Sequence, residues 1–301
     1  MLRSMNLSLS NICGGRCVFC PATRGTAHGR HMSWAVAERC IAEAKENGIR
    51  AFSVGENGDA LLNPQCLDIL TELRVTIPDA RVVLFTNFQN MTPEISTVML
   101  EADLVNAVTM NMDGTATYER IKGMPLGPVA ANLRAWLEIR GDLSVPLTIQ
   151  VLTAPAYARG VQALFGALPG NMAALAELPD EYDRLVSAWQ GPLRPGDTIL
   201  RSPAVGWAHR DLVSGDQTRF ACSQLDRVKN EAFIAPDGSW YACCLMDEQT
   251  VTFGNIMDSS LAEMESSERR AWLITRLEAR EYSAVGYPCA TVQACQWRQE
   301  P

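Results

Sequence analysis

The sequence predicts an α/β fold, in which a parallel sheet curls into a partial (β/α)6 TIM-like barrel followed by a small C-terminal domain. In the first half of the chain, short apolar or alternating stretches that are typical of strands take turns with amphipathic stretches that are typical of helices. From about residue 215 the pattern changes to a hairpin followed by a long helix. We therefore expect a barrel domain at 1–211 and an appended domain at 212–301.

Local signals support each element of the barrel in turn. Residues 5–10 alternate apolar and polar side chains, as a half-buried strand does. Ser33 is a suitable N-cap for the first helix, and Gly48 follows its end. Thr92 and Pro93 have the residue types of an N-cap and a first helical turn. Further strands are expected at 51–54, 81–86, 104–112 and 146–152, and further helices at 65–74 and 129–140.

The second half has fewer repeated units. Residues 177–191 have a helical pattern, and 191–197 read as a loop. Two short strands within 231–244 flank Pro236-Asp237-Gly238, which is a hairpin turn signal. A long helix is expected at 259–281.

Composition and charge narrow the class of protein. The 301 residues are 47% hydrophobic and 20% charged, which is ordinary for a globular chain. No run of about 18 apolar residues and no signal-peptide core is found, so we expect a cytoplasmic protein with no membrane association. The formal charge of −8 argues against nucleic acid as a partner. It would suit a cationic substrate, although mild acidity is also common in cytosolic proteins.

Eight of the ten cysteines fall into two groups, at 13–20 and at 222–295. In a reducing compartment such grouping favours metal binding over disulfides. Cys13, Cys17 and Cys20 have the spacing CxxxCxxC. Structural zinc normally takes four protein ligands, whereas a 4Fe–4S cluster held by three thiolates leaves one iron open.

This triplet, with the aromatic Phe19 before its last cysteine, resembles the signature of the radical S-adenosylmethionine (SAM) enzymes. The resemblance implies that Cys13, Cys17 and Cys20 hold a 4Fe–4S cluster whose open iron binds S-adenosyl-L-methionine. It further implies reductive cleavage of that cofactor to a 5′-deoxyadenosyl radical, with an electron donor such as flavodoxin or ferredoxin as a partner.

Two other stretches resemble motifs of the same family. In "GDALLNP" (58–64), Gly58 and Asp59 match the residues that bind the methionine amino group, and Glu56 is a rival for that contact. In "TMNMDG" (109–114), Asn111 stands where a side chain meets the ribose or carboxylate. For Asn111 and Asp113, a capped turn after a strand is an equally good interpretation. The resemblance thus implies cofactor contacts from Phe19, Gly58, Asp59 and Asn111.

The second group of cysteines resembles the SPASM/Twitch extension of these enzymes, in its shorter Twitch form with one auxiliary 4Fe–4S cluster. A glycine at 238 precedes the second cysteine of the group at the spacing found there. The natural ligands are Cys222, Cys243, Cys289 and Cys295. A zinc site of the same thiolates is the alternative, because spacing does not separate zinc from iron–sulfur ligation.

Cys244 is left over by this assignment. On the strand expected there, it would point to the face opposite Cys243 and away from the cluster. A thiol in that place can give a hydrogen atom to a substrate radical, since an S–H bond is weaker than a sugar C–H bond. A small buried apolar cysteine is the alternative.

The layout, the acidic balance and Cys244 together resemble radical epimerases that tailor carbohydrate or aminoglycoside antibiotics. The resemblance implies a small cationic substrate, inversion of a C–H stereocentre, and Cys244 as the catalytic thiol. One alternative is a radical SAM dehydrogenase that oxidises a secondary alcohol of an aminocyclitol through the auxiliary cluster. Another is a non-enzymatic binding module in which the cysteines hold zinc.

Overall fold

Parallel pairing of successive strands organises this chain, which is described here from a computed structural model covering residues 2–17, 20, 29–151, 177–201, 221–222, 224–244, 251–286 and 289. Strands β1 to β6 lie in chain order in one sheet, and each pairs in parallel with the next. Their bounds are β1 Ser4–Leu7, β2 Ala51–Val54, β3 Arg81–Phe85, β4 Ala107–Asn111, β5 Leu147–Val151 and β6 Thr198–Arg201. The expected partial barrel is confirmed.

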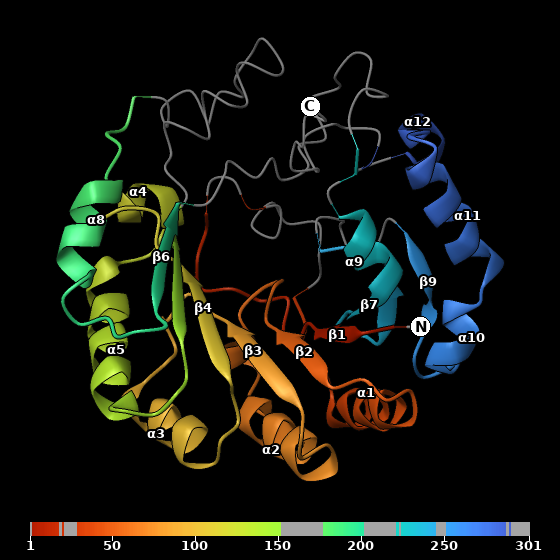
Figure 1. The fold of residues 1–301 in the computed structure, drawn as a ribbon, viewed down its shortest axis with the longest axis horizontal. Helices are drawn as coiled ribbons and strands as arrows, with labels where there is room; N and C mark the ends of the chain where they lie inside the picture. The colour runs from red at the N-terminus through yellow and green to blue at the C-terminus, as the bar shows by residue number, and fades with distance from the viewer. Residues whose placement is uncertain are drawn as a thin grey trace.

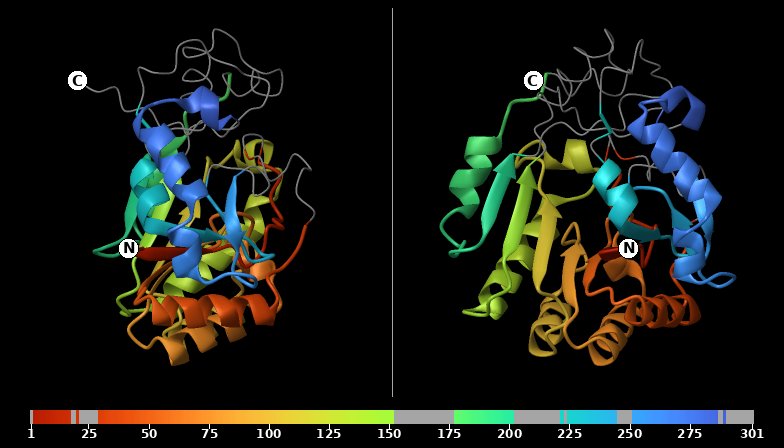
Figure 2. Two further views of the ribbon diagram at one scale, coloured as in Figure 1. Left: turned by 90° about the vertical axis from the view of Figure 1, so that its right-hand side faces the viewer. Right: turned by 45° about the vertical axis from the view of Figure 1, so that its right-hand side comes forward.

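The sheet continues beyond β1 into the C-terminal part of the chain. There β7 (Glu231–Ile234) pairs in parallel with β1, and β8 (Ser239–Tyr241) and β9 (Thr252–Asn255) extend the sheet antiparallel. Figure 2 shows the N-terminus beside these strands. The expected boundary at residue 212 lies outside the described residues.

The helices connect the strands and cover the outer side of the curved sheet, as α1, α2, α3 and α5 do in Figure 1. Their bounds are α1 Trp34–Glu46, η2 Ala60–Leu62, α2 Cys66–Thr76, α3 Pro93–Glu101, α4 Tyr118–Lys122, α5 Leu126–Arg140, α8 Tyr182–Trp189, α9 Leu225–Asn230, α10 Leu261–Glu265, α11 Glu268–Glu278 and α12 Tyr282–Val285. Within the described residues no helix is long and apolar enough to cross a membrane.

The capping signals act as expected. The Ser33 hydroxyl accepts a hydrogen bond from the Val36 N–H at 3.4 Å, and the Thr92 hydroxyl accepts one from the Ile95 N–H at 3.4 Å. Each satisfies an amide that has no partner inside its own helix. Gly238 has φ +87° in the turn between β7 and β8, a conformation that glycine adopts without strain.

The prediction of one long helix at 259–281 is wrong, because two shorter helices, α10 and α11, lie within this stretch. The Ser267 side chain accepts a hydrogen bond from the Arg270 N–H at 3.3 Å and so begins α11, one residue after α10 has ended at its C-cap Ser266. Two strands, β6 and β9, were not expected. In β6 three of the four residues are exposed, so no apolar pattern marks it in the sequence.

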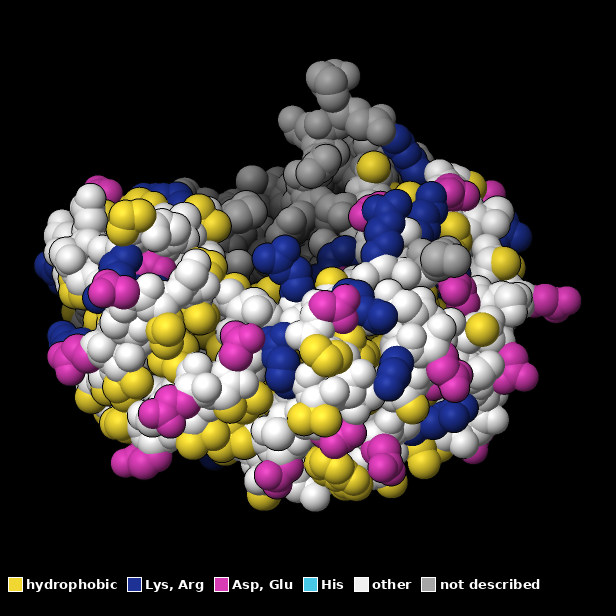
Figure 3. All heavy atoms as spheres, turned by 60° about the horizontal axis from the view of Figure 1, so that its bottom comes forward, with side chains coloured by type: hydrophobic (Ala, Val, Ile, Leu, Met, Phe, Trp, Pro, Cys, Tyr) yellow, Lys and Arg dark blue, Asp and Glu magenta, His cyan; other side chains and the backbone are white. Residues whose placement is uncertain are grey.

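Charge of both signs is interspersed over the helix-bearing face of the molecule. Over the face in Figure 3, Lys and Arg side chains lie among Asp and Glu side chains. The negative net charge of the chain therefore does not gather on this face.

A buried ion pair joins the end of α5 to the segment before β6. The Arg140 guanidinium donates two hydrogen bonds to the Asp197 carboxylate, at 2.6 and 2.8 Å, and the two side chains are 3% and 1% exposed. Asp197 also accepts the Leu147 N–H at 2.8 Å, which ties the pair to β5. The pair therefore fixes the position of β6 at the edge of the sheet.

Arg140→Ala is expected to lower the free energy of unfolding by about 3–5 kcal/mol, because it leaves the Asp197 carboxylate buried without its partner. The matched control is Arg194→Ala, which removes an exposed ion pair with Asp142. That change should cost only about 0–1 kcal/mol. Urea unfolding of both variants measures the difference, and equal losses would contradict this role for Arg140.

Candidate active site

The cysteine triplet lies on the loop that follows β1, at the carboxyl end of the parallel strands. The Cys13 sulfur accepts hydrogen bonds from the Gly15 N–H and the Asn87 amide, both at 3.4 Å. The Cys20 N–H donates to the Cys17 carbonyl at 3.0 Å. Burial raises the pKa of both the Cys13 and the Cys17 thiol, and the charges of these two thiols act on each other. The structure thus brings the triplet together on one tight loop.

Backbone contacts from the loop after β2 hold this cysteine loop in place. The Asp59 N–H donates to the Ile12 carbonyl at 2.8 Å. Gly58 has φ +73°, and a Cβ added there would lie 2.2 Å from the Ser10 carbonyl oxygen. Only glycine fits so close to the passing backbone. Gly58 and Asp59 therefore position the loop that carries Cys13.

The Asp59 carboxylate is enclosed by the protein. It accepts hydrogen bonds from the Leu61 N–H at 3.1 Å, the Thr86 hydroxyl at 3.1 Å and the Asn87 N–H at 3.3 Å. The residue is 0% exposed, and burial raises its pKa. These contacts make Asp59 the cap of η2 and a link to the segment after β3, while its contact with the cofactor stays a prediction.

The segment after β4 supplies further polar groups. Asn111 ends β4 and is exposed, as a cofactor contact would require. Asp113 is buried, and its Oδ2 lies 2.8 Å from the Lys122 Nζ. Lys122 in turn hydrogen-bonds to Cys17, and its carbonyl accepts the Arg16 N–H at 2.7 Å. The segment that follows β4 thus contacts the cysteine loop directly.

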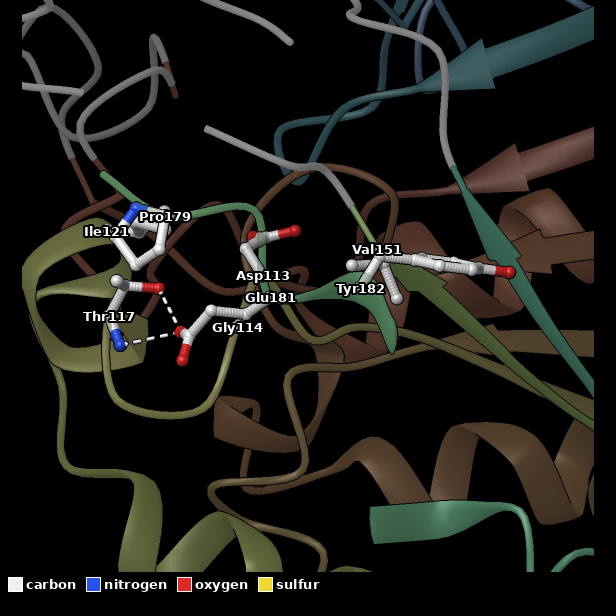
Figure 4. Close-up of a pocket in the computed structure, with 8 residues that line it drawn as sticks. All are labelled: Asp113, Gly114, Thr117, Ile121, Val151, Pro179, Glu181 and Tyr182. Carbon is white, nitrogen blue, oxygen red and sulfur yellow. Dashed lines mark hydrogen bonds between the residues drawn. The ribbon is translucent and has the colours of Figure 1, made fainter. Parts of the chain in front are cut away.

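The segment after β4 lines a small cavity beside Asp113, and Glu181, on the wall of the same cavity, holds this segment in place (Figure 4). The Glu181 carboxylate accepts the Thr115 N–H at 2.9 Å, the Ala116 N–H at 3.1 Å and the Thr117 N–H at 2.9 Å. It also accepts the hydroxyls of Thr115 and Thr117. Burial raises the pKa of Glu181, but the hydrogen bonds from Thr117 and Thr115 outweigh it and hold the pKa at about 2.

Glu181 should therefore stabilise the fold in a pH-dependent way. Since its folded-state pKa lies below its ordinary value of 4.5, its contribution is complete above pH 4.5 and is lost as the pH falls toward about 2. Glu181→Gln, which presents an amide to these donors, should lower the melting temperature at pH 7. The gap to the unsubstituted protein should shrink steadily between pH 4.5 and 2. A gap independent of pH would contradict this role.

The second group of cysteines also comes together in part. Cys243 and Cys289 are buried and Cys222 is half-buried, and the charges of Cys243 and Cys222 both act on the Cys289 thiol. Burial is the main cause that raises the pKa of Cys289 well above its ordinary value. Three of the four expected ligands are therefore neighbours. Cys295, like Phe19 in the first motif, lies outside the described residues.

Cys244 contacts Arg227 and Gln224. Because β8 ends at Tyr241, the two cysteines follow the strand, and the expectation that both lie on it is wrong. The Cys244 sulfur accepts a hydrogen bond from the Arg227 Nη1 at 3.2 Å and donates to the Gln224 Oε1 at 3.8 Å. Arg227 also contacts the Glu56 carboxylate at 2.7 Å, just after β2. Cys244 is thereby linked to the carboxyl end of the barrel.

The residues present fit iron–sulfur ligation. Thiolates with N–H donors, such as Cys13 with two, are the ligands that iron–sulfur clusters use. The Tyr118 hydroxyl, on the same short helix as Lys122, is a buried donor that has no hydrogen-bond partner among the described residues. Within the described part of the chain no three His, Cys, Asp or Glu side chains converge on a single metal ion. A 4Fe–4S cluster differs, since each thiolate binds its own iron.

Four residues of this site were not expected from the sequence: Tyr118, Lys122, Glu181 and Arg227. No local pattern marks them, because their places in the site depend on how separate segments of the chain pack together. The Arg227 contact with Glu56, for example, spans 171 residues.

Comparisons with solved structures place the fold. BtrN in complex with AdoMet and 2-DOIA shares 14% identity over 100% of this chain and 97% of its own, with a TM-score of 0.58. Native anSMEcpe with bound AdoMet shares 14% over 91% and 83%, with a TM-score of 0.61. SuiB of Streptococcus suis bound to S-adenosylmethionine shares 12% over 91% and 68%, with a TM-score of 0.58. At such identities the likeness shows the fold alone. Among curated proteins, none is similar enough in sequence to count as a relative.

Two family models match the chain and together cover more than half of it. Residues 7–140 match the radical SAM superfamily, and residues 222–296 match SPASM, an iron–sulfur cluster-binding domain. The first match contains the cysteine triplet, and the second contains all four expected ligands of the auxiliary cluster. The cofactors that the resemblance implied, S-adenosylmethionine and two iron–sulfur clusters, agree with both families. The chain carries a radical SAM domain at residues 7–140 and a SPASM-type iron–sulfur cluster-binding domain at residues 222–296.

Proposed function

We propose that this protein is a radical SAM epimerase of the neomycin C epimerase type, which inverts a C–H stereocentre of a carbohydrate or aminoglycoside antibiotic. The observation that supports this proposal best is the placement of Cys244. It is a buried thiol that contacts Arg227 and Gln224, next to but distinct from the three neighbouring cysteines of the auxiliary group.

Arg227, which hydrogen-bonds to this thiol, is itself held in place by two ion pairs. Its Nη2 lies 2.7 Å from the Glu56 Oε1, and its Nε lies 2.6 Å from the Glu231 Oε2. The carboxylates are 11% and 6% exposed, so water screens these pairs little. Glu56 belongs to the loop after β2, and Glu231 begins β7, which pairs with β1. Through Glu56, Arg227 and Cys244 are linked to the carboxyl end of β2, the end of the sheet that carries the cysteine triplet, whereas Glu231 lies at the amino end of β7.

A fixed thiol at this end suits the return of a hydrogen atom. When bound, the cluster and S-adenosylmethionine supply a carbon radical that removes a hydrogen atom from the substrate. Cys244 then donates from the opposite face: its S–H bond breaks, a C–H bond forms on the substrate, and a thiyl radical is left on sulfur. One electron from a flavodoxin- or ferredoxin-type donor and one proton from solvent restore the thiol.

The proposed substrate is a polycation, because the chain carries a net charge of −8. Asp113 follows β4 and Glu56 follows β2. Both are already paired within the protein, to Lys122 and Arg227. Substrate ammonium groups would thus meet carboxylates outside these two pairs.

A radical SAM dehydrogenase is the second candidate. The similarity of the fold to BtrN, which was solved with AdoMet and 2-DOIA and is covered over 97% of its length, favours it. The two reactions differ in mass balance. An epimerase returns a hydrogen atom and leaves the mass unchanged, whereas a dehydrogenase releases a ketone lighter by two hydrogens.

A screen of aminoglycosides and aminocyclitols with the reduced enzyme tests the proposal. We expect an S-adenosylmethionine-dependent product of unchanged mass in water and of one added deuterium at the inverted carbon in deuterated water. A ketone product would assign the dehydrogenase activity instead. Zinc without acid-labile sulfide in the protein would exclude both enzymes.

A further inference from the structure

A buried charge pair lies directly beside the first cluster loop and has no part in the proposed hydrogen transfer. The Lys122 Nζ lies 2.8 Å from the Asp113 Oδ2, and the two side chains are 5% and 0% exposed. Burying an ion pair is costly unless further contacts offset the lost hydration. Here the further contact is Cys17, to which Lys122 also hydrogen-bonds.

The positive member of the pair, the Lys122 ammonium, is the one directed toward the cysteine triplet. The Lys122 side chain hydrogen-bonds to Cys17, so the ammonium is the end of the pair that meets the cysteine loop. The backbone agrees, because the Lys122 carbonyl accepts the Arg16 N–H at 2.7 Å, one residue before Cys17.

Tyr118, one turn earlier on α4, adds a second donor to the same place. Its side chain is 0% exposed, and its hydroxyl has no hydrogen-bond partner among the described residues. It shares the short helix α4 with Lys122, whose carbonyl accepts the Arg16 N–H of the cysteine loop at 2.7 Å. A buried hydroxyl without a partner is rare, and it indicates a group that the bound state supplies.

We propose that Lys122 and Tyr118 are positioning residues that raise the reduction potential of the cluster held by Cys13, Cys17 and Cys20. The potential of an iron–sulfur cluster depends on the net charge around it and on hydrogen bonds to its sulfurs. A positive charge and an O–H donor stabilise the reduced, more negative cluster. This inference rests on the radical SAM domain and not on the epimerase proposal, so each can fail alone.

The test is a redox titration of the full-length, cluster-loaded protein, followed by electron paramagnetic resonance. Added S-adenosylmethionine perturbs the signal of the N-terminal cluster and so identifies it beside the auxiliary cluster. Lys122→Met should lower the potential of that cluster, and Tyr118→Phe should lower it by less. Asp113→Asn should raise it, because the negative end of the pair is removed while the amide oxygen still accepts from Lys122. Lys122→Arg, which keeps the charge, is the matched control.

Opposite shifts for Lys122→Met and Asp113→Asn are the decisive result, since general damage to the site would move both potentials alike. Shifts of the same sign, or none, overturn the proposal. Weaker S-adenosylmethionine binding with an unchanged potential also overturns it, and assigns Lys122 to cofactor binding. If Lys122→Met fails to take up iron, the shifts of Tyr118→Phe and Asp113→Asn decide.

Discussion

Cys17→Ala is expected to abolish cleavage of S-adenosylmethionine, with no 5′-deoxyadenosine detected by liquid chromatography. The substitution leaves the N-terminal cluster with two protein thiolates, Cys13 and Cys20, where three are needed. Cys17 is also the thiol that contacts Lys122, so its loss removes one of the contacts between the cysteine loop and α4. The expected loss is complete, whatever the substrate.

The matched control is Cys66→Ala. Cys66 begins α2 and is 3% exposed, and burial raises its pKa to about 12, which marks an unreactive packing residue. This variant should lose some stability and keep full cleavage activity. Normal cleavage by Cys17→Ala would show that the triplet is not the cofactor site.

Cys244→Ala is expected to keep S-adenosylmethionine cleavage in the presence of substrate and to yield no inverted product. The cofactor site does not include Cys244, so hydrogen abstraction continues, but the substrate radical meets no thiol. The ion pairs of Arg227 with Glu56 and Glu231 remain, so the surrounding structure should be retained. Product analysis by mass spectrometry and nuclear magnetic resonance measures the outcome.

Cys244→Ser separates donation from packing. The hydroxyl keeps a hydrogen-bonding group near Arg227, but its O–H bond is too strong to give a hydrogen atom to a carbon radical. Both variants should therefore fail to invert the substrate. Inversion at the normal rate by either one would rule out Cys244 as the donor.

Much of the fold follows from signals that are local in the sequence. The strand at 51–54 has its expected bounds, because its four residues form a short apolar stretch that ends clearly on both sides. The helix after Ser33 and the turn at Gly238 could be predicted because both signals are local. Ser33 caps the helix that follows it, and Gly238 adopts the positive φ of its own turn. The N-terminal cysteine triplet is recognisable because its spacing is contained within eight residues.

Features that depend on distant contacts could not be predicted. The strand β6 is mostly exposed and is defined by its pairing with β5. The helix expected at 259–281 is divided at Ser267, which caps a new helix. The apolar periodicity of the whole stretch gives no sign of this division. Arg227 gains its role from Glu56 and Cys244, which come from separate parts of the chain.

Metal analysis of the anaerobically reconstituted protein decides whether the two cysteine groups hold iron–sulfur clusters. We expect a brown protein with about eight iron and eight sulfide ions per chain, as two 4Fe–4S clusters require, and about half of that in a variant with all of Cys13, Cys17 and Cys20 replaced by alanine. A colourless protein, or one whose iron content is unchanged by loss of the triplet, would contradict it.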